Sequence, residues 1–239
     1  MRPPYSEYAA PPIYVYPQPQ RGGVRFSRTE LVQLSLAVLG LSAAFTVVLV
    51  NPFYGGGLDL FPGNLAANVG YGFLAALLSV GFGVGLHEIM HKIVAQRYGH
   101  WAEFRYSPQG LLMAFVFAFL GFIFGAPGAT YISGAVTPEQ NSRISAAGPL
   151  TNIGLGVVFF AALVVTAPVA YVGTLAYYAA YLFAIVASVN LILAAFNMLP
   201  IMPLDGAKVW SWNKGMWLGI LLVALGILGF GAWQHYLFI

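Results

Sequence analysis

The sequence predicts an all-α polytopic membrane protein, with about five transmembrane helices and one further segment that forms a re-entrant or interfacial hairpin. Of its 239 residues, 59% are hydrophobic and only 7% are charged, whereas a soluble domain carries about 25% charged residues. The apolar runs are long and do not alternate with polar residues, which favours membrane helices over barrel strands. The net charge of +3 is small and spread along the chain, so nucleic-acid binding is not expected.

The first 28 residues differ in composition from the rest of the chain. Residues 1–28 are rich in Pro and Tyr and lack a helical period, which predicts a disordered or extended tail. Prolines interrupt its apolar residues, and no cleavage site follows a short apolar core, so a signal peptide is not predicted. A polyproline ligand for a partner domain is the alternative to a plain tail. Residues 29–239 are expected to form one membrane domain.

Five apolar runs are each long enough to cross about 30 Å of hydrocarbon as a helix. The first is LVQLSLAVLGLSAAFTVVLV at residues 31–50. The other four are expected at about residues 67–96, 150–169, 172–199 and 216–238. Most of the domain is therefore expected to lie within the lipid bilayer.

The run GLLMAFVFAFLGFIFGAPGATYI at residues 110–132 is ambiguous, because its apolar core is near the lower limit for a span and ends in Gly and Pro. Lys and Arg stay on the cytoplasmic side of membrane proteins, so their positions can decide. If this run does not cross, every Lys and Arg is cytoplasmic, and the external loops 51–66 and 168–173 carry none. If it crosses, three of these charges become external. We therefore expect a re-entrant or interfacial hairpin and a cytoplasmic N-terminus.

Residues 87–91 read HEIMH, which is an HExxH motif inside an apolar run. On a helix, positions i and i+4 share a face, so His87 and His91 can bind one zinc ion through their imidazoles. Glu88 lies beside them and can act as the base that takes a proton from a zinc-activated water. A pair of core histidines is the alternative, but burying His, Glu and His together without a metal is costly.

Zinc needs a third protein ligand, and the chain has no cysteine to supply one. Most of its acids are expected in or beside the tail, in the external loop or in the polar cytoplasmic region, namely Glu7, Glu30, Asp59, Glu103 and Glu139. Asp205 instead follows the cytoplasmic end of the fourth span, in FNMLPIMPLDGAKV at 196–209. Glu88 lies nine residues before Arg97, about 13 Å inside the same boundary. Asp205 is therefore the candidate third ligand.

The residues around Asp205 predict an interrupted helix. Pro200 and Pro203 break the fourth span before Asp205, and Gly206 frees the backbone after it. A kinked, unwound segment would let this short carboxylate reach the metal, although LDG could also be a helix C-terminus with a turn. Asn197 is the other polar residue here. Its amide could hydrogen-bond a substrate backbone or an oxyanion, or it could cap the helix that ends before the first proline.

Together, HEIMH at 87–91, NMLPIMPLDG at 197–206 and AAGPLTN at 146–152 resemble the site-2 protease family of intramembrane zinc metalloproteases. The likeness covers roughly residues 70–210, which places the catalytic core at about 67–210. It implies one zinc ion held by His87, His91 and Asp205, with Glu88 as the catalytic base.

The resemblance also implies a membrane-associated β-hairpin within residues 101–135 and a role in substrate engagement for Asn197. Asn152 matches the asparagine of the family's middle core helix, and both a substrate-binding role and plain packing are open for it. No PDZ-like domain is inserted between the motifs, so the chain resembles a compact form of the family.

The expected function is that of an intramembrane zinc endopeptidase, which hydrolyses peptide bonds in or near the transmembrane helices of membrane-protein substrates. The site is expected to open to the cytoplasmic side of the cell membrane. A prenyl-protein protease is one alternative, but it calls for a glutamate ligand on a later helix, and no suitable glutamate follows the motif. A non-enzymatic metal-binding transporter or scaffold is another, although a transporter more often shows internal repeats and polar residues along several spans.

Overall fold

The computed structural model describes residues 23–51 and 58–237. Most of the predicted tail, residues 1–22, and part of the loop after the first span lie outside the described residues. The elements in chain order are α1 (Arg28–Val50), α2 (Leu65–Ala76), the π-helical segment η2 (Leu77–Gly81), α3 (Phe82–Arg97), β1 (Trp101–Tyr106), α4 (Pro108–Ala118), β2 (Gly128–Ser133), α5 (Pro138–Thr166), η3 (Ala167–Val169), α6 (Leu175–Asn197), α7 (Asp205–Trp212) and α8 (Lys214–Trp233).

The prediction of five membrane helices is confirmed. Within the described residues, five continuous helical stretches are long and apolar enough to cross a bilayer, namely Arg28–Val50, Leu65–Arg97, Pro138–Val169, Leu175–Asn197 and Lys214–Trp233. The second of these joins α2, η2 and α3 into 33 residues. The HExxH motif therefore lies within a continuous helix that is long and apolar enough to span the membrane.

The third span begins earlier than expected. We expected a start near residue 150, but α5 begins at Pro138 and contains the whole AAGPLTN motif. A capping box fixes this start, because the Thr137 hydroxyl accepts the Gln140 amide and the Gln140 side chain accepts the Thr137 amide. The first turns of α5 are too polar to continue the apolar run, yet they are helical. The motif therefore lies on a continuous helix that packs against α3.

The ambiguous run at 110–132 does not form a membrane-spanning helix. Its helical part, α4, has 11 residues, or about 16 Å of helix, which is too short for a hydrocarbon layer of about 30 Å. In the chain, this helix follows β1 and precedes β2. The two strands pair antiparallel, from Trp101 opposite Ser133 to Tyr106 opposite Gly128. The expected hairpin segment is present, and its two strands are joined by a helix and a loop instead of a tight turn.

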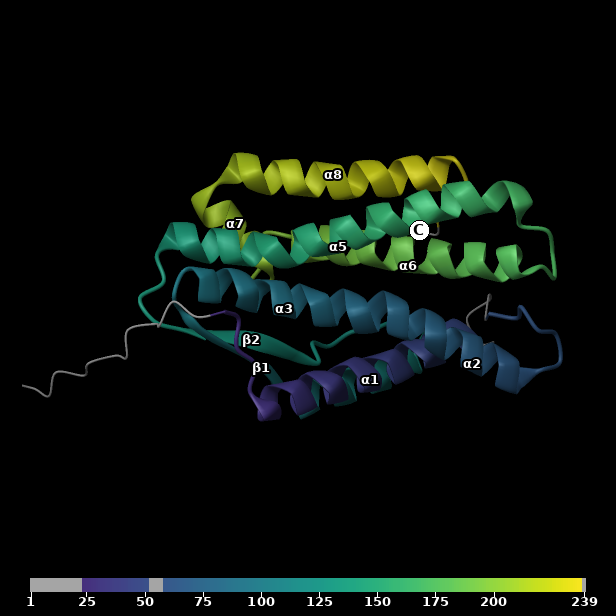
Figure 1. Cartoon of the computed structure of the whole chain (residues 1–239), viewed down its shortest axis with the longest axis horizontal. Coiled ribbons are helices and arrows are strands. Elements are labelled where there is room, and N and C mark those ends of the chain that lie inside the picture. The colour runs from purple at the N-terminus through teal and green to yellow at the C-terminus, as the bar shows by residue number, and fades with distance from the viewer. Residues whose placement is uncertain (1–22, 52–57, 238–239) are drawn as a thin grey trace, which may run out of the picture.

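Figure 1 shows α5 and α6 side by side at the centre of the molecule, with α8 on one side and α3 on the other. Helix α1 lies beyond α3, and the two-stranded sheet packs against both α1 and α3 near one end of the bundle. The short helix α7 lies near that same end, where the chain turns back after α6. These elements place the sheet, the HExxH helix and α7 in one region.

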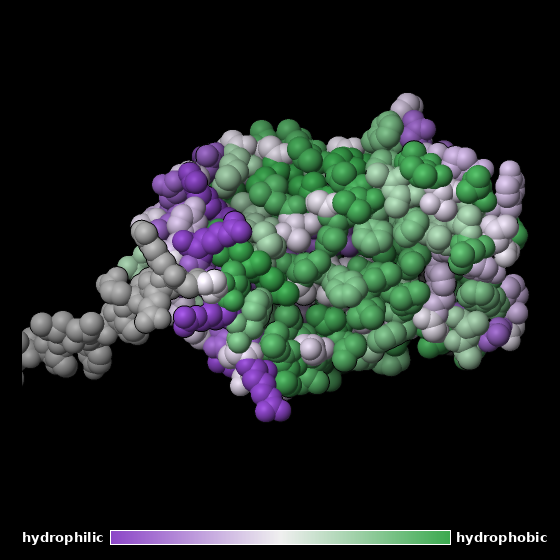
Figure 2. All heavy atoms as spheres, viewed as in Figure 1, coloured by the Kyte–Doolittle hydropathy of each residue, from purple (hydrophilic) through white to green (hydrophobic). Residues whose placement is uncertain are grey.

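Figure 2 shows a broad hydrophobic band, with hydrophilic side chains gathered at the ends and most densely at the end that carries the sheet and α7. The starts of α1, α5 and α8, the end of α3, the sheet and α7 all belong to this end (Figure 1). They carry, or directly adjoin, all the Lys and Arg residues that the structure describes, namely Arg25, Arg28, Lys92, Arg97, Arg105, Arg143, Lys208 and Lys214. The charge asymmetry expected from the sequence is therefore present in the fold.

A buried ion pair joins the start of α1 to the HExxH helix. Glu30 and Lys92 are 1% and 2% exposed, respectively, and Lys92 Nζ donates to Glu30 Oε2. The other carboxylate oxygen, Glu30 Oε1, accepts the backbone N–H of Phe104 in β1 at 2.9 Å. Glu30 lies beside the tail, as expected from the sequence, and its carboxylate also holds together α1, α3 and β1.

Replacing Lys92 with methionine is expected to lower the free energy of unfolding by about 3–5 kcal/mol, because the Glu30 carboxylate is left buried without its partner. The matched control is Arg143→Met, which breaks the Glu139–Arg143 pair at 2.7 Å, where both side chains are about half exposed. That change is expected to cost no more than about 1 kcal/mol. Thermal unfolding of both variants in detergent measures the difference. Equal losses of stability in the two variants would show that the buried pair contributes no more to stability than the exposed pair.

Candidate metal centre

The two histidines of the HExxH motif lie one turn apart on α3 and are both buried. Their ring centroids are 4.6 Å apart. His87 Nδ1 lies 2.7 Å from Asn152 Oδ1, and His91 Nδ1 lies 2.7 Å from the backbone oxygen of Ile144. Because an oxygen acceptor faces each Nδ1, the proton of each neutral ring belongs there. Both Nε2 atoms are then left with a lone pair, as a metal ligand requires.

Asp205 is the first residue of α7, and it meets both histidines. One oxygen, Oδ2, lies 3.1 Å from His87 Nε2 and 3.0 Å from His91 Nε2. The chain leaves α6 after Asn197 and turns back through the two prolines of the sequence motif before α7 begins. LDG therefore opens a new helix and does not end the previous one. The structure brings together the three residues that the sequence analysis selected as ligands.

The surroundings of Asp205 favour its charged form. Burial alone would raise the pKa of this carboxyl, but the imidazoles of His91 and His87 beside it lower the pKa well below its usual range. The second oxygen, Oδ1, lies 3.3 Å from Lys208 Nζ, one turn further along α7. Asp205 is therefore a carboxylate at neutral pH, with Oδ2 directed at the histidines and Oδ1 at a lysine.

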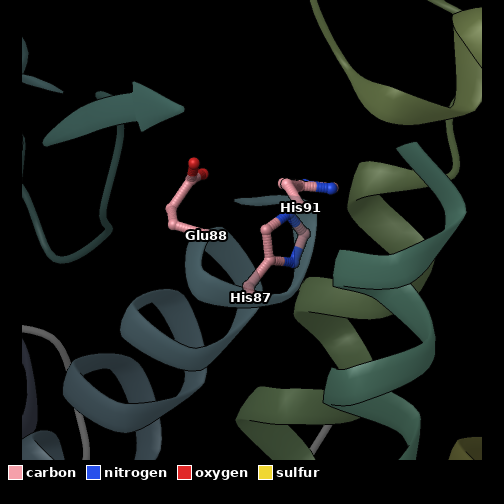
Figure 3. A group of neighbouring side chains, drawn as sticks. All are labelled: His87, Glu88 and His91. Atoms are coloured by element: carbon pink, nitrogen blue, oxygen red, sulfur yellow. The ribbon is translucent and has the colours of Figure 1, made fainter. Parts of the chain in front are cut away.

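Glu88 lies next to the histidines but turns the other way, as Figure 3 shows. Its Oε2 accepts the backbone N–H of Thr130 in β2 at 2.8 Å, and its backbone oxygen accepts the Thr130 hydroxyl at 3.1 Å. The potential ligand atoms of His87, Glu88 and His91 nevertheless lie within 4.8 Å of one another. Glu88 is thus close enough to serve chemistry at the cluster, while its contacts differ from those of Asp205.

Proteins with similar sequences are named as zinc metalloproteases. A protein of Methanocaldococcus jannaschii named "Putative zinc metalloprotease MJ0611" is 38% identical over 208 residues, which cover 86% of this chain and 94% of that protein. The chain belongs to the site-2 protease family of membrane zinc metalloproteases. "Putative zinc metalloprotease Rip3" of Mycobacterium tuberculosis is 30% identical over 167 residues, which cover 61% of this site-2 protease and 37% of Rip3. No family model and no solved structure matches the chain.

This site-2 protease is a zinc metalloprotease, and its buried cluster fits the metal. Catalytic zinc sites commonly use three protein ligands and leave a further position for water or substrate. Two imidazole Nε2 atoms with bound Nδ1 partners and one ionised carboxylate supply that number. Without a metal, the Asp205 carboxylate would need a proton on the Nε2 atoms that face it, whereas a metal ion would let both Nε2 atoms keep their lone pairs as ligands.

The AAGPLTN motif of this site-2 protease supports His87 in two ways. A Cβ atom added to Gly148 would lie 2.4 Å from His87 Nε2, so only glycine leaves room for the ring. Asn152 is fully buried and places its Oδ1 on His87, while its Nδ2 donates to the Gly83 backbone oxygen and to Asn190 Oδ1. Asn152 therefore faces a histidine and its neighbouring helices, where it can orient the ring.

Replacing Gly148 with alanine is expected to displace the His87 ring. Zinc affinity should then fall by more than about 10-fold, because changing a residue that only orients a metal ligand already lowers metal affinity by at least that much. The matched control is Gly154→Ala on the same helix, where no atom lies within 4 Å of an added Cβ. That change should keep zinc and stabilise the exposed helix by up to about 1 kcal/mol. Metal analysis of the purified variants tests the contrast, and full zinc content in the Gly148 variant would refute it.

Asn197 lies at the last turn of α6 and is half-buried. Its Nδ2 donates to the Leu193 backbone oxygen at 2.9 Å, so part of the side chain is bound to its own helix. No described residue bonds to Asn197 Oδ1. The structure thus contains the helix-terminal contact that we considered as an alternative, and it leaves an acceptor for another molecule.

Three polar residues near the site were not identified from the sequence. Asn190 continues the Asn152 contact to the Ser79 backbone oxygen in η2, at 3.3 Å. A lone asparagine inside an apolar span is itself a signal of function or interhelical bonding, so Asn190 could have been found. Thr130 and Lys208 carry no comparable signal, because only the fold places them beside Glu88 and Asp205.

Proposed function

We propose that this protein is an intramembrane endopeptidase, which hydrolyses peptide bonds in or near the transmembrane helices of membrane proteins. The observation that carries the proposal is the burial of the His87, His91 and Asp205 cluster inside a bundle of five apolar helices, near its basic end. A metalloprotease for soluble substrates has no need of that placement. The positive-inside rule favours a cytoplasmic location for the basic end, and with it for the opening of the site and the N-terminus.

The proposed roles follow from the contacts of each side chain. His87, His91 and Asp205 hold one zinc ion, which when bound supplies a Lewis acid for the scissile carbonyl and for an attacking water. Glu88 accepts the proton of that water and returns it to the leaving amine. Asn152 and the Ile144 backbone oxygen orient the two imidazoles. These assignments make Glu88 the residue on which the chemical step depends most directly.

Asn197 and Lys208 have supporting roles in this proposal. The amide of Asn197 stands at the end of α6 with Oδ1 available to accept a substrate N–H, and its second amide hydrogen can donate to a developing oxyanion. Lys208 neutralises Asp205 Oδ1, which leaves Oδ2 as the oxygen directed at the metal. Asn197 therefore acts on the substrate and Lys208 acts through a ligand.

The sheet offers a docking edge for an extended substrate segment. The N–H groups of Phe104 and Thr130, which lie opposite each other, both point away from the partner strand, since each donates to a glutamate side chain. Backbone groups in antiparallel pairs alternate in direction, so residues 128, 130 and 132 of β2 all face outward. The outer edge of β1 is covered by α1, through Glu30 and Gln33.

The outer edge of β2 is open by contrast. Among the described residues, only Glu88 bonds to its outward-facing backbone groups, at Thr130 N–H. A helical substrate hides its carbonyls in its own hydrogen bonds, so it must unwind before hydrolysis, and strand addition holds such an unwound segment. We propose that the substrate pairs with β2, beside the base.

Zinc dependence tests this function in its simplest form. We expect the purified protein to cleave a transmembrane substrate in detergent, to lose this activity when a chelator removes zinc, and to regain it when zinc is added back. Activity that persists in metal-free protein, with zinc loss verified by metal analysis, would contradict the proposal. A zinc-loaded protein that transports zinc into proteoliposomes and cuts no substrate would favour the transporter alternative.

A further inference from the structure

We propose that the backbone N–H of Thr130 is a switch contact, which holds the Glu88 carboxylate while the β2 edge is empty and passes to a substrate carbonyl when an extended segment docks. Docking would thereby release the base for catalysis. The inference rests on the proposed function, because it assigns a regulatory step to the same site. Thr130 acts through Glu88 and through the docking edge, so it is a positioning residue.

Two acceptors compete for the one hydrogen of the Thr130 amide: the Glu88 carboxylate and a docked substrate carbonyl. Thr130 N–H donates to Glu88 Oε2 at 2.8 Å. The same N–H lies in the outward row of β2, where an added strand must form its ladder bonds. A backbone amide has a single hydrogen, so a substrate carbonyl that pairs at this position displaces the carboxylate.

Strand β2 does not depend on the Glu88 side chain for its position against α3. The Thr130 hydroxyl separately donates to the Glu88 backbone oxygen at 3.1 Å. This bond keeps β2 on α3 whichever way the carboxylate turns. The carboxylate can therefore leave the strand while the docking edge stays beside the site.

A Glu88 carboxylate released from Thr130 lies close to the two histidines. The potential ligand atoms of Glu88, His87 and His91 already lie within 4.8 Å of one another, and Figure 3 shows that the Glu88 carboxylate now lies on the side away from the two rings. Rotation of this half-buried side chain brings it toward the cluster. The base is thus available when the edge is occupied and held when it is empty.

The experiment measures substrate binding to inactive, zinc-loaded variants. The probe is a fluorescein-labelled transmembrane peptide with an extended flank, in detergent micelles, followed by anisotropy. The side-chain oxygen of Glu88→Gln can still accept from Thr130 N–H, whereas Glu88→Ala has no competing acceptor. We expect the alanine variant to bind the peptide about fivefold more tightly than the glutamine variant, which corresponds to one ordinary hydrogen bond.

Two proline backgrounds show whether Thr130 N–H carries this difference. Thr130→Pro removes that N–H and, because the group faces outward, breaks no bond to β1. The alanine and glutamine variants should then bind equally. Thr130→Pro also removes the hydroxyl bond to the Glu88 backbone oxygen, so Thr130→Val, which loses the hydroxyl and keeps the N–H, is the matched control and should retain the fivefold difference. Ile132→Pro removes the next outward N–H, which does not contact Glu88, so the fivefold difference should persist at a lower overall affinity. A difference that survives Thr130→Pro would arise from space at position 88 and would overturn the switch.

The binding and cleavage measurements also distinguish failure of the Thr130 switch from failure of the proposed protease function. Equal binding by the alanine and glutamine variants, with normal cleavage by the unmodified protein, overturns the switch and leaves the protease proposal intact. Failure of the unmodified, zinc-loaded protein to cleave the same peptide overturns the protease proposal first. If the Thr130→Pro protein does not fold, equal binding by the alanine and glutamine variants in the unmodified background still overturns the switch.

Discussion

Replacing Glu88 with glutamine is expected to lower kcat for a transmembrane substrate by roughly 10²–10⁴-fold, the usual contribution of a general base. Glutamine is nearly the same size and can keep the Thr130 contact, but it cannot take up a proton at neutral pH. Because Glu88 does not share the contacts of Asp205, bound zinc should remain. Cleavage rates and metal content, measured on the same preparation, check both halves of the prediction.

The control for this substitution is Glu139→Gln, at an acid that is about half exposed and pairs with Arg143 on the surface. It makes the same chemical change away from the site and should leave the cleavage rate within about twofold of the unmodified protein, because exposed pairs contribute little. A Glu88→Gln protein that cleaves at the normal rate would remove Glu88 from the mechanism. Loss of zinc in that variant would instead make Glu88 a ligand.

Replacing Asp205 with alanine is expected to abolish stoichiometric zinc and, with it, cleavage. The substitution deletes the one oxygen that lies within 3.1 Å of both histidine Nε2 atoms. Losing a residue that only orients a ligand costs about 10–100-fold in metal affinity, so losing a ligand should cost more than about 100-fold. A zinc titration against a competing chelator gives the affinity directly.

Lys208→Met provides the graded comparison for Asp205. It keeps the carboxylate but removes the ammonium 3.3 Å from Oδ1. Loss of this partner and loss of its repulsion of the metal oppose each other, so zinc affinity should change far less than in Asp205→Ala, by about 10-fold or less. Asp205→Ala should have the larger effect, because it removes the proposed ligand itself, whereas Lys208→Met removes only a residue beside that ligand. If Asp205→Ala retains full zinc affinity, another residue completes the site and the proposed ligand set is wrong.

The membrane helices and the motif residues were predictable from the sequence because their signals are local. An apolar run of 20 residues or more has few folded alternatives to a membrane helix, and HExxH places two histidines on one helical face by geometry alone. Asp205 was selected by its depth relative to the motif, and the structure brings it to both imidazoles. The extra turns of α5 were missed because the Thr137 capping box extends the helix into polar sequence.

The contacts that the sequence did not predict join residues far apart in the chain. Glu30 follows a Pro- and Tyr-rich stretch and looks like a surface acid, yet α3 and β1 bury it against Lys92. Thr130 lies in a run that resembles a short apolar segment, and only strand pairing and the packing of β2 on α3 turn its N–H toward Glu88. Such roles depend on which elements meet, which hydropathy and local motifs do not encode.

The position of the cut distinguishes intramembrane cleavage from cleavage of the soluble flanks of a substrate. The protein would be reconstituted in lipid vesicles with a single-span substrate, and the products mapped by mass spectrometry. Because Glu88 lies about 13 Å along α3 from Arg97, we expect cleavage inside the hydrophobic segment, about two to three helical turns from its cytoplasmic end, and no such product without zinc. Cleavage confined to the soluble flanks, with the transmembrane segment intact, would contradict it.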